Sequence, residues 1–303
     1  MTPADQIAFG TGGLRSPDVF AEACRAGYRL FDTAVYYEND AEVLAGIARC
    51  DAAPAVRLIH KVQPYRVSAQ FARLIAPKLD GRPLDTLLLH HPALFVLDAR
   101  TAAFLGPWRE LEALVEKGLV RHIGLSNAGP AFVDYLCAHA AVRPAVNQIE
   151  GHPWHYDAEL VRACQERGVQ VQCYSPLGSG RLPVLQASTL QEIARALGRS
   201  PAQVCLRWLV QKGVVPVVRT RDPARMRDNL EALAFSLDEA QMEAIDGMAK
   251  AVKAWDDPVK RGCRSAAVTE ERIRVRNRAR FALRSGLHYL AVEMFLRRGR
   301  ARR

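Results

Sequence analysis

Four ionisable side chains in the first 90 residues could together perform acid–base chemistry: Asp32, Tyr37, Lys61 and His90. A tyrosine alone is a poor proton donor at neutral pH, because its ordinary pKa is about 10. A lysine ammonium beside it favours the phenolate, a carboxylate keeps that ammonium charged, and an imidazole can bind a developing oxyanion. Such a set suits the protonation of an oxyanion as a hydride reaches a carbonyl carbon. The hydride would have to come from a bound cofactor, since no side chain supplies one.

Short β-like runs alternate with amphipathic helical runs between residues 7 and 250. The expected strands cover 7–11, 29–32, 57–61, 86–90, 120–125, 145–148, 170–174 and 214–218. The expected helices cover 17–26, 40–49, 68–79, 108–117, 130–140, 157–167, 189–198 with 201–212, and 223–233. Eight strand–helix units favour an α/β fold of the (β/α)₈ TIM barrel type over an open doubly wound sheet. A G-x-G-x-x-G after the first strand, which a Rossmann fold would carry, is missing.

Polar residues stand at the carboxyl ends of seven of these expected strands. They are Asp32, Lys61, His90 with His91, Ser126 with Asn127, Asn147 with Gln148, Tyr174 with Ser175, and Arg219 with Thr220. A (β/α)₈ barrel keeps its active site at the carboxyl ends of its strands. We therefore expect these side chains to share one rim of the barrel and to form one site.

With these residues in place, the chain resembles an aldo-keto reductase. The segment Asp32-Thr33-Ala34-Val35-Tyr36-Tyr37 matches the D-T-A-x-x-Y motif of that family, and Lys61 and His90 complete its tetrad. Tyr36 is the neighbouring rival, but the five-residue spacing favours Tyr37. The stretch His90-His91-Pro92 stands where the family usually has H-W-P. The resemblance covers about residues 7–249 and implies that Asp32, Tyr37, Lys61 and His90 are the catalytic residues of an oxidoreductase that reduces an aldehyde or ketone.

The resemblance also implies where a nicotinamide cofactor would bind. The segment 118–127 is similar to the family's G-x-V-R-x-I-G-V-S-N, so Ser126 and Asn127, with Gln148, would hold the carboxamide. These amides and this hydroxyl both donate and accept hydrogen bonds, as that group requires. Tyr174 would stack on the nicotinamide ring. The residues implied along the diphosphate are Ser175, Leu177 and Ser179.

The segment 219–229 resembles the family's K-S-x-x-P-x-R-x-x-E-N. The resemblance implies that Arg219, Thr220 and Arg225 bind the adenosine 2′-phosphate and that Asp228 and Asn229 lie near the adenine. Guanidinium groups suit a phosphate because they bind it in bidentate fashion. We therefore expect NADPH as the cofactor, with NADH less favoured.

The bulk composition is typical of a soluble globular protein, with 49% hydrophobic and 24% charged residues. The seven cysteines are odd in number and form no C-x-x-C pair, which argues against a disulfide framework or a structural zinc site and favours a reduced, cytoplasmic setting. We expect no metal, no signal peptide in the first six residues, and no membrane span, because no apolar run reaches about 18 residues.

The net charge of +10 is concentrated at the C-terminus, where twelve arginines and three glutamates fall within residues 264–303. We therefore divide the chain into a barrel at 1–250 and a basic extension, expected to be helical, at 251–303. Apolar residues between 283 and 295 recur at helical spacing and are flanked by arginines. The extension could dock on the barrel, bind a membrane surface or bind a protein partner. Its aromatic residues are sparse, and no nucleic-acid contact is expected.

An alternative function from another class remains open at this point. The same scaffold could serve as a cofactor-binding regulatory subunit that docks a partner through the basic tail. The presence of all four tetrad residues favours the enzyme, since a sensor would not need them. The small-molecule substrate itself is not specified by these motifs beyond its carbonyl group.

Overall fold

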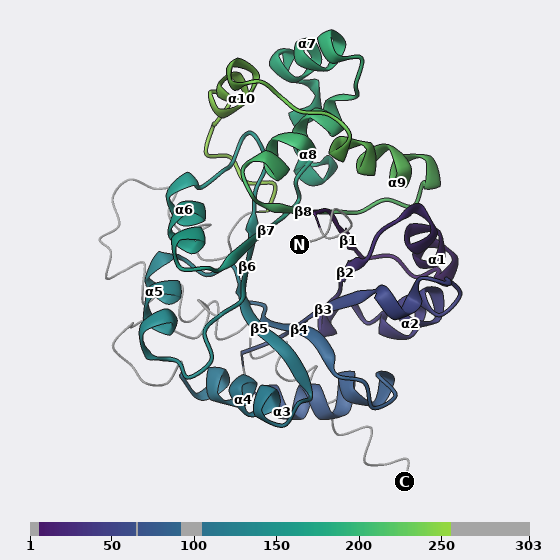
Figure 1. Cartoon of the computed structure of the whole chain (residues 1–303), viewed down its shortest axis with the longest axis vertical. Coiled ribbons are helices and arrows are strands. Elements are labelled where there is room, and N and C mark those ends of the chain that lie inside the picture. The colour runs from purple at the N-terminus through teal and green to yellow at the C-terminus, as the bar shows by residue number, and fades with distance from the viewer. Residues whose placement is uncertain (1–5, 65, 92–104, 256–303) are drawn as a thin grey trace.

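The computed structural model describes residues 6–64, 66–91 and 105–255 of the chain. Eight parallel strands close into a barrel in sequential order, and the helices surround it (Figure 1). The strands are β1 (Ala8–Gly10), β2 (Leu30–Asp32), β3 (Arg57–Val62), β4 (Leu84–Leu89), β5 (Val120–Ser126), β6 (Val146–Glu150), β7 (Gln170–Tyr174) and β8 (Val215–Val218). The expected (β/α)₈ barrel is therefore confirmed, with all eight strands at the places that the sequence predicted.

Helices connect consecutive strands on the outside of the barrel. They are α1 (Pro17–Ala26), α2 (Asp40–Ile47), α3 (Val67–Gln70), α4 (Leu105–Glu116), α5 (Pro130–His139), α6 (Ala158–Glu166), α7 (Ser188–Leu197), α8 (Pro201–Gln211), α9 (Pro223–Leu230) and α10 (Glu239–Asp246). Both α7 and α8 lie between β7 and β8, and α9 and α10 follow the last strand.

Two helical segments differ from the sequence-based expectation. The helix expected at 68–79 is α-helical only in α3 and continues as a π-helical turn at Phe71–Ile75 and a 3₁₀ turn at Ala76–Lys78. Pro77 lies in that last turn and lacks the N–H that an α-helix would use. The additional helix α10 begins with a capping box, in which Asp238 accepts a hydrogen bond from the Gln241 amide at 2.8 Å.

Side-chain alternation along the strands divides the barrel interior into an apolar and a polar part. Leu30 and Ile59 belong to a small apolar cluster to which β1, β2, β3, β4, β6 and β8 all contribute, as expected for the barrel interior. Successive side chains of a strand point to opposite faces, so Asp32 and Lys61, two residues further on, share the face of Leu30 and Ile59. The apolar cluster therefore fills the interior below the carboxyl rim and leaves charged side chains at that rim.

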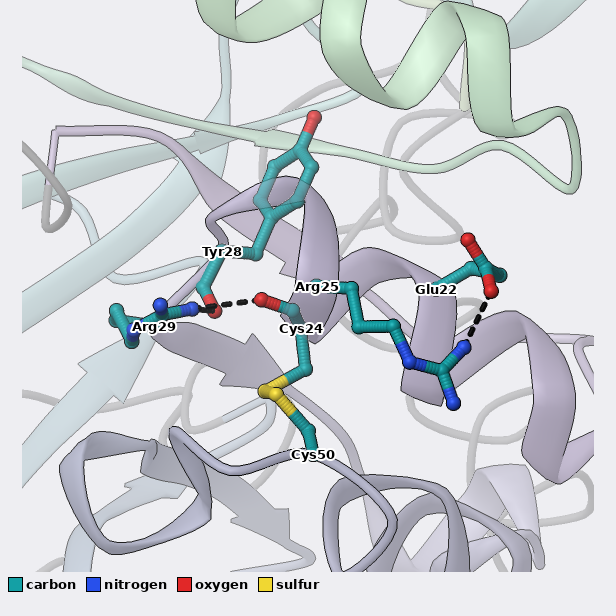
Figure 2. The surroundings of a disulfide bond; sticks show 6 residues. All are labelled: Glu22, Cys24, Arg25, Tyr28, Arg29 and Cys50. Atoms are coloured by element: carbon teal, nitrogen blue, oxygen red, sulfur yellow. Dashed lines mark hydrogen bonds and ion pairs between the residues drawn. A yellow bond between two sulfur atoms is a disulfide. The ribbon is translucent and has the colours of Figure 1, made fainter.

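The structure contains a disulfide, although the odd number of cysteines and the lack of a C-x-x-C pair argued against a disulfide framework. Cys24, near the end of α1, and Cys50, after α2, are joined by a disulfide, with their Cα atoms 6.2 Å apart (Figure 2). In the same view, Arg29 donates a hydrogen bond to the backbone carbonyl of Cys24 at 2.7 Å. The two cysteines are 26 residues apart in the chain, and only the packing of α1 against α2 brings them together.

The described part of the chain contains no helix with the length and apolar character needed to cross a lipid bilayer. The domain boundary near residue 250 stays a prediction. The apolar periodicity expected between residues 283 and 295 lies outside the described residues.

Packing of α2 against α1 depends on Gly46, and we expect Gly46→Ala to destabilise the fold. A Cβ at this position would lie 2.3 Å from the Pro17 carbonyl oxygen and 2.6 Å from Phe20 Cβ, so the helices would have to move apart. Overpacking of this kind costs about 1–3 kcal/mol, measurable as a lower urea midpoint. Gly106→Ala in α4 is the control, because its Cβ would meet no atom within 4 Å. A Gly46→Ala midpoint equal to that of the unmodified protein would contradict the argument.

Candidate active site

The four side chains predicted to act together meet at the carboxyl rim of the barrel. Asp32 ends β2, and its carboxylate forms an ion pair with the ammonium of Lys61 on the neighbouring strand β3. Tyr37 is delivered by a 3₁₀ turn at Val35–Tyr37, and its phenol hydrogen-bonds with Lys61, which can only donate. His90 follows β4, and its ring meets that of Tyr37 edge to face, with the centroids 6.3 Å apart.

Burial and charge act in opposite directions on the two central groups. Burial raises the pKa of Tyr37 above its ordinary value, and the positive charge of Lys61 lowers it by less. The lysine thus acts with the sign that the sequence predicted, but desolvation outweighs it. Burial disfavours the Lys61 ammonium, yet Asp32 and Tyr37 together raise the pKa of Lys61. At neutral pH the phenol therefore retains its proton and the lysine its charge.

Gln148 on β6 contacts both the Asp32–Lys61 pair and Gln172 on β7. Its Nε2 donates to Asp32 Oδ1 at 2.7 Å and lies 3.0 Å from Gln172 Oε1. Because a carboxylate can only accept, this contact fixes which end of the Gln148 amide faces Asp32. The Oε1 atom of Gln148 is then the end of the amide that can accept from an N–H donor in the cleft.

Asn127 follows β5 and contacts residues at the carboxyl ends of β4 and β7. Its backbone has the left-handed φ of 61°, and its Nδ2 donates to the His90 carbonyl at 3.0 Å, while the Tyr174 hydroxyl donates to its Oδ1 at 2.8 Å. The same Nδ2 lies 3.2 Å from His91 Nδ1. His91 in turn stacks on His90, with ring centroids 4.4 Å apart and an interplanar angle of 12°. Asn127 therefore ties three strand ends together at the rim.

A cleft of about 1750 Å³ opens at this rim. The predicted residues that line it are Asp32, Tyr37, His90, Ser126, Asn127, Gln148, Tyr174, Ser175, Leu177, Ser179, Arg219 and Arg225. Lys61 is 1% exposed and lies behind Asp32 and Tyr37. Amide, hydroxyl and aromatic groups along one continuous cleft fit the donor and acceptor pattern of a nicotinamide dinucleotide.

A second cavity of about 410 Å³ lies where the 2′-phosphate was expected, lined by Leu14, Arg219, Thr220, Arg221, Asp222 and Arg225. Arg219 donates to the Gly12 carbonyl at 2.6 Å, and Arg221 donates to the Gly13 carbonyl at 3.2 Å. These two guanidinium groups are thus held against the loop after β1 by backbone acceptors, while Arg225 Nε lies 3.6 Å from Asp222 Oδ2. Three guanidinium groups and a threonine hydroxyl in one cavity fit a phosphate ester.

Asp228 and Asn229 line neither cavity. The Asp228 carboxylate accepts from Gln203 Nε2 at 2.9 Å and from the Ser200 hydroxyl at 3.2 Å, both at the start of α8. Asn229 is buried and hydrogen-bonds with the side chain of Tyr28. The structure therefore places both side chains in the packing of α8 and α9, and their expected proximity to adenine stays a prediction.

A set of polar side chains between β3 and α2 was not expected from the sequence. His60 precedes Lys61 on β3 and so faces the helices, where its Nε2 lies 3.0 Å from Asp40 Oδ1. Lys78 donates to Asp40 Oδ2 at 2.7 Å. Asn39 donates to the carbonyls of Thr11 and Leu14, both at 2.8 Å, and so ties the loop after β1 to the start of α2. The sequence could have predicted this contact. In the pair His60–Lys61 one side chain must face the helices, and a buried polar residue there needs a partner.

The chain is similar to known proteins in sequence and in structure. Residues 15–250 match the family described as Aldo/keto reductase family. The chain is similar to 2,5-diketo-D-gluconic acid reductase B of Corynebacterium sp. (strain SHS752001), with 35% identity over 265 residues, 84% of this chain and 93% of that protein. It is 30% identical over 282 residues to the probable NAD(P)H-dependent D-xylose reductase xyl1 of Emericella nidulans, covering 80% and 88%.

A solved structure extends the likeness to three dimensions. The chain superposes on the Bombyx mori aldo-keto reductase in complex with NADP with a TM-score of 0.75 and 26% identity, covering 84% of this chain and 92% of that one.

The Asp40 contacts generate a prediction about stability and pH. Burial alone would raise the pKa of Asp40, but His60 and Lys78 outweigh it and lower the pKa from 3.8 to about 2. A carboxyl with a depressed folded-state pKa stabilises the fold above its unfolded pKa, and this contribution is lost as the pH falls from about 4 through about 2. We expect Asp40→Asn to lose about 2 kcal/mol at pH 7.

Urea unfolding of both proteins at pH 7, 4 and 3 checks this expectation, and the difference between them should shrink at the lower values. Asp51→Asn, which changes an exposed carboxylate, is the matched control. A constant difference at all three pH values would show that the charge of Asp40 is not what stabilises the fold.

Proposed function

Because the chain belongs to the aldo/keto reductase family of oxidoreductases, we propose that it reduces an aldehyde or ketone with NADPH, using Tyr37 as the proton donor. The observation that carries the proposal is the continuous set of contacts from Tyr37 through Lys61 to Asp32 and Gln148. It joins a protonated phenol directly to a side chain expected to hold the cofactor.

Each tetrad residue has a distinct task in this mechanism. A reduced nicotinamide, when bound, supplies the hydride that reaches the carbonyl carbon. His90 and Tyr37 orient the carbonyl oxygen by hydrogen bonds, and Tyr37 transfers its proton to that oxygen as negative charge develops there. Lys61 stabilises the phenolate that remains, and Asp32 keeps Lys61 charged and in place. The product is the corresponding alcohol.

The cofactor would lie along the cleft with its nicotinamide beside the tetrad. Ser126, Asn127 and Gln148 would hold the carboxamide, with Gln148 Oε1 accepting from its N–H group. Tyr174 would pack against the ring, while its hydroxyl keeps the contact with Asn127. Ser175, Leu177 and Ser179 would follow the diphosphate, and Asp228 and Asn229 would reach the adenine only if they left their present partners.

NADPH rather than NADH is supported by the arginine-lined cavity at Arg219, Thr220 and Arg225. One relative is named as a probable NAD(P)H-dependent reductase, so the preference needs its own test. Carbonyl compounds to be tested as substrates should include sugar-derived ketones and aldehydes, which the names of two relatives suggest. Simple aromatic aldehydes should be tested beside them.

We expect Tyr37→Phe to lower kcat for carbonyl reduction by about 10²–10⁴-fold, because the general acid is removed. The dissociation constant for NADPH should stay within about twofold, since the phenol hydroxyl does not hold the cofactor in this proposal. NADPH oxidation followed by absorbance measures the first quantity, and fluorescence titration measures the second. Tyr36→Phe is the control, because Tyr36 is the adjacent tyrosine and is 64% exposed.

Activity of Tyr37→Phe equal to that of the unmodified protein would show that the proton comes from elsewhere. Tight NADPH binding by the unmodified protein without turnover of any carbonyl compound would instead favour a cofactor-binding regulatory subunit.

The cofactor preference predicts a selective loss in Arg225→Ala. A charge-assisted hydrogen bond to the 2′-phosphate would be removed, so the dissociation constant for NADPH should rise about tenfold while that for NADH changes less than about twofold. Arg227→Ala is the matched control, because Arg227 is exposed on the same helix and lines neither cavity. Equal losses for NADPH and NADH would mean that Arg225 does not contact the 2′-phosphate.

A further inference from the structure

The last described residues of the chain line the cleft at the place expected for the cofactor diphosphate. The indole Nε1 of Trp255 donates to the Ser175 hydroxyl at 2.9 Å and lies 3.4 Å from the Ser179 hydroxyl. The two serines also contact each other, with Ser179 donating to Ser175 at 2.7 Å. The Trp255 indole therefore contacts the two hydroxyl groups that the proposed function assigns to the diphosphate.

A cationic side chain on the same loop is engaged as well. The guanidinium of Arg181 lies 3.5 Å from the centre of the Trp255 ring, a cation–π contact at close range. Arg181 follows Ser179 by two residues, lines the same cleft and is exposed. While it stacks on the indole, one face of its guanidinium is covered by the ring.

The backbone next to Trp255 is held by a buried carboxylate. The amide N–H groups of Ala254 and Trp255 both donate to the Glu150 carboxylate, the second at 3.3 Å. Glu150 ends β6, is 3% exposed, and is also 3.2 Å from His152 Nε2. The segment from Lys250 is held in addition by the Trp154 carbonyl, which accepts from the Lys250 and Val252 amides at 3.1 and 3.2 Å. The main chain is thus fixed at Glu150 while the indole reaches outward.

The indole itself is weakly held compared with this anchor. Trp255 is 45% exposed, whereas Trp108 and Trp208 are fully buried. Its contacts are hydrogen bonds to exposed or half-buried hydroxyls and the stacked Arg181, all of which water can replace. A rotation of this one side chain would uncover Ser175, Ser179 and Arg181 without disturbing the Glu150 anchor.

We propose that Trp255 is a residue of the cofactor site that competes with the diphosphate: in the free protein its indole holds Ser175, Ser179 and Arg181, and cofactor binding displaces it. This inference rests on the proposed function, since it concerns the same groove. It assigns a role to the start of the C-terminal extension, which the tetrad and the family motifs do not involve. The free energy of the indole contacts is subtracted from the affinity for the cofactor.

The test compares cofactor affinity in full-length Trp255→Phe and in the unmodified protein by calorimetry. Phenylalanine keeps a ring for Arg181 but has no N–H for the serines. We expect NADPH to bind Trp255→Phe about three- to tenfold more tightly, the effect of deleting one or two competing hydrogen bonds. Adenosine 2′-monophosphate, which has no diphosphate, should bind both proteins with the same affinity.

Intrinsic fluorescence gives a readout that does not depend on turnover. Addition of NADP⁺ should shift the emission of the unmodified protein to longer wavelength, because the Trp255 indole moves into water. The shift should be absent from Trp255→Phe and retained in Trp154→Phe, which changes the other partly buried tryptophan.

Equal or weaker NADPH binding by Trp255→Phe overturns this inference and leaves the proposed function standing. A tighter binding of adenosine 2′-monophosphate by the variant overturns it too, because the competition would then not involve the diphosphate. A failure of every variant to bind NADPH overturns the proposed function and this inference together.

Discussion

The charge of Lys61 is the constraint on which the arrangement of the rim depends. An ammonium that is 1% exposed is tolerated only with a paired carboxylate, because an unpaired buried charge costs several kcal/mol. Asp32 supplies that carboxylate from the adjacent strand, and the same oxygen accepts from Gln148. One carboxylate thus orients the lysine that contacts Tyr37 and the amide that faces the cleft. The acid–base group and the expected cofactor contact are therefore fixed relative to each other.

The closed barrel fixes the Asp32–Lys61 pair, because both residues belong to strands. Asp32 and Lys61 lie on adjacent strands whose backbone register places Asp32 opposite Ile59. Strand alternation then turns Lys61 inward and His60 outward, where Asp40 receives it. Two neighbouring residues of β3 consequently serve different networks, one at the rim and one under α2. Both networks use a buried carboxylate to hold a group that can carry positive charge.

The groove proposed for the dinucleotide contains two serines with an uncommon backbone conformation. Ser175 and Ser179 have left-handed backbones with φ of 56° and 54°, which is uncommon for residues other than glycine. Their hydroxyls hold the exposed indole of Trp255, and Arg219 rests on the carbonyl of Gly12. A phosphate oxygen can replace the Gly12 carbonyl as the acceptor for Arg219, whereas the indole N–H is a donor and has to leave before the serine hydroxyls can donate to a diphosphate.

Sequence alone determined the barrel, its eight strands and the meeting of Asp32, Tyr37, Lys61 and His90, because strand alternation and the carboxyl-end rule act locally and repeat in every unit. It did not determine the contacts that lie away from the strand ends. The disulfide between Cys24 and Cys50, the position of Asp228 against α8, and the placement of Trp255 in the groove all depend on how the helices and the segment 250–255 pack. The sign of the Tyr37 pKa shift was likewise decided by burial, which only the folded environment sets.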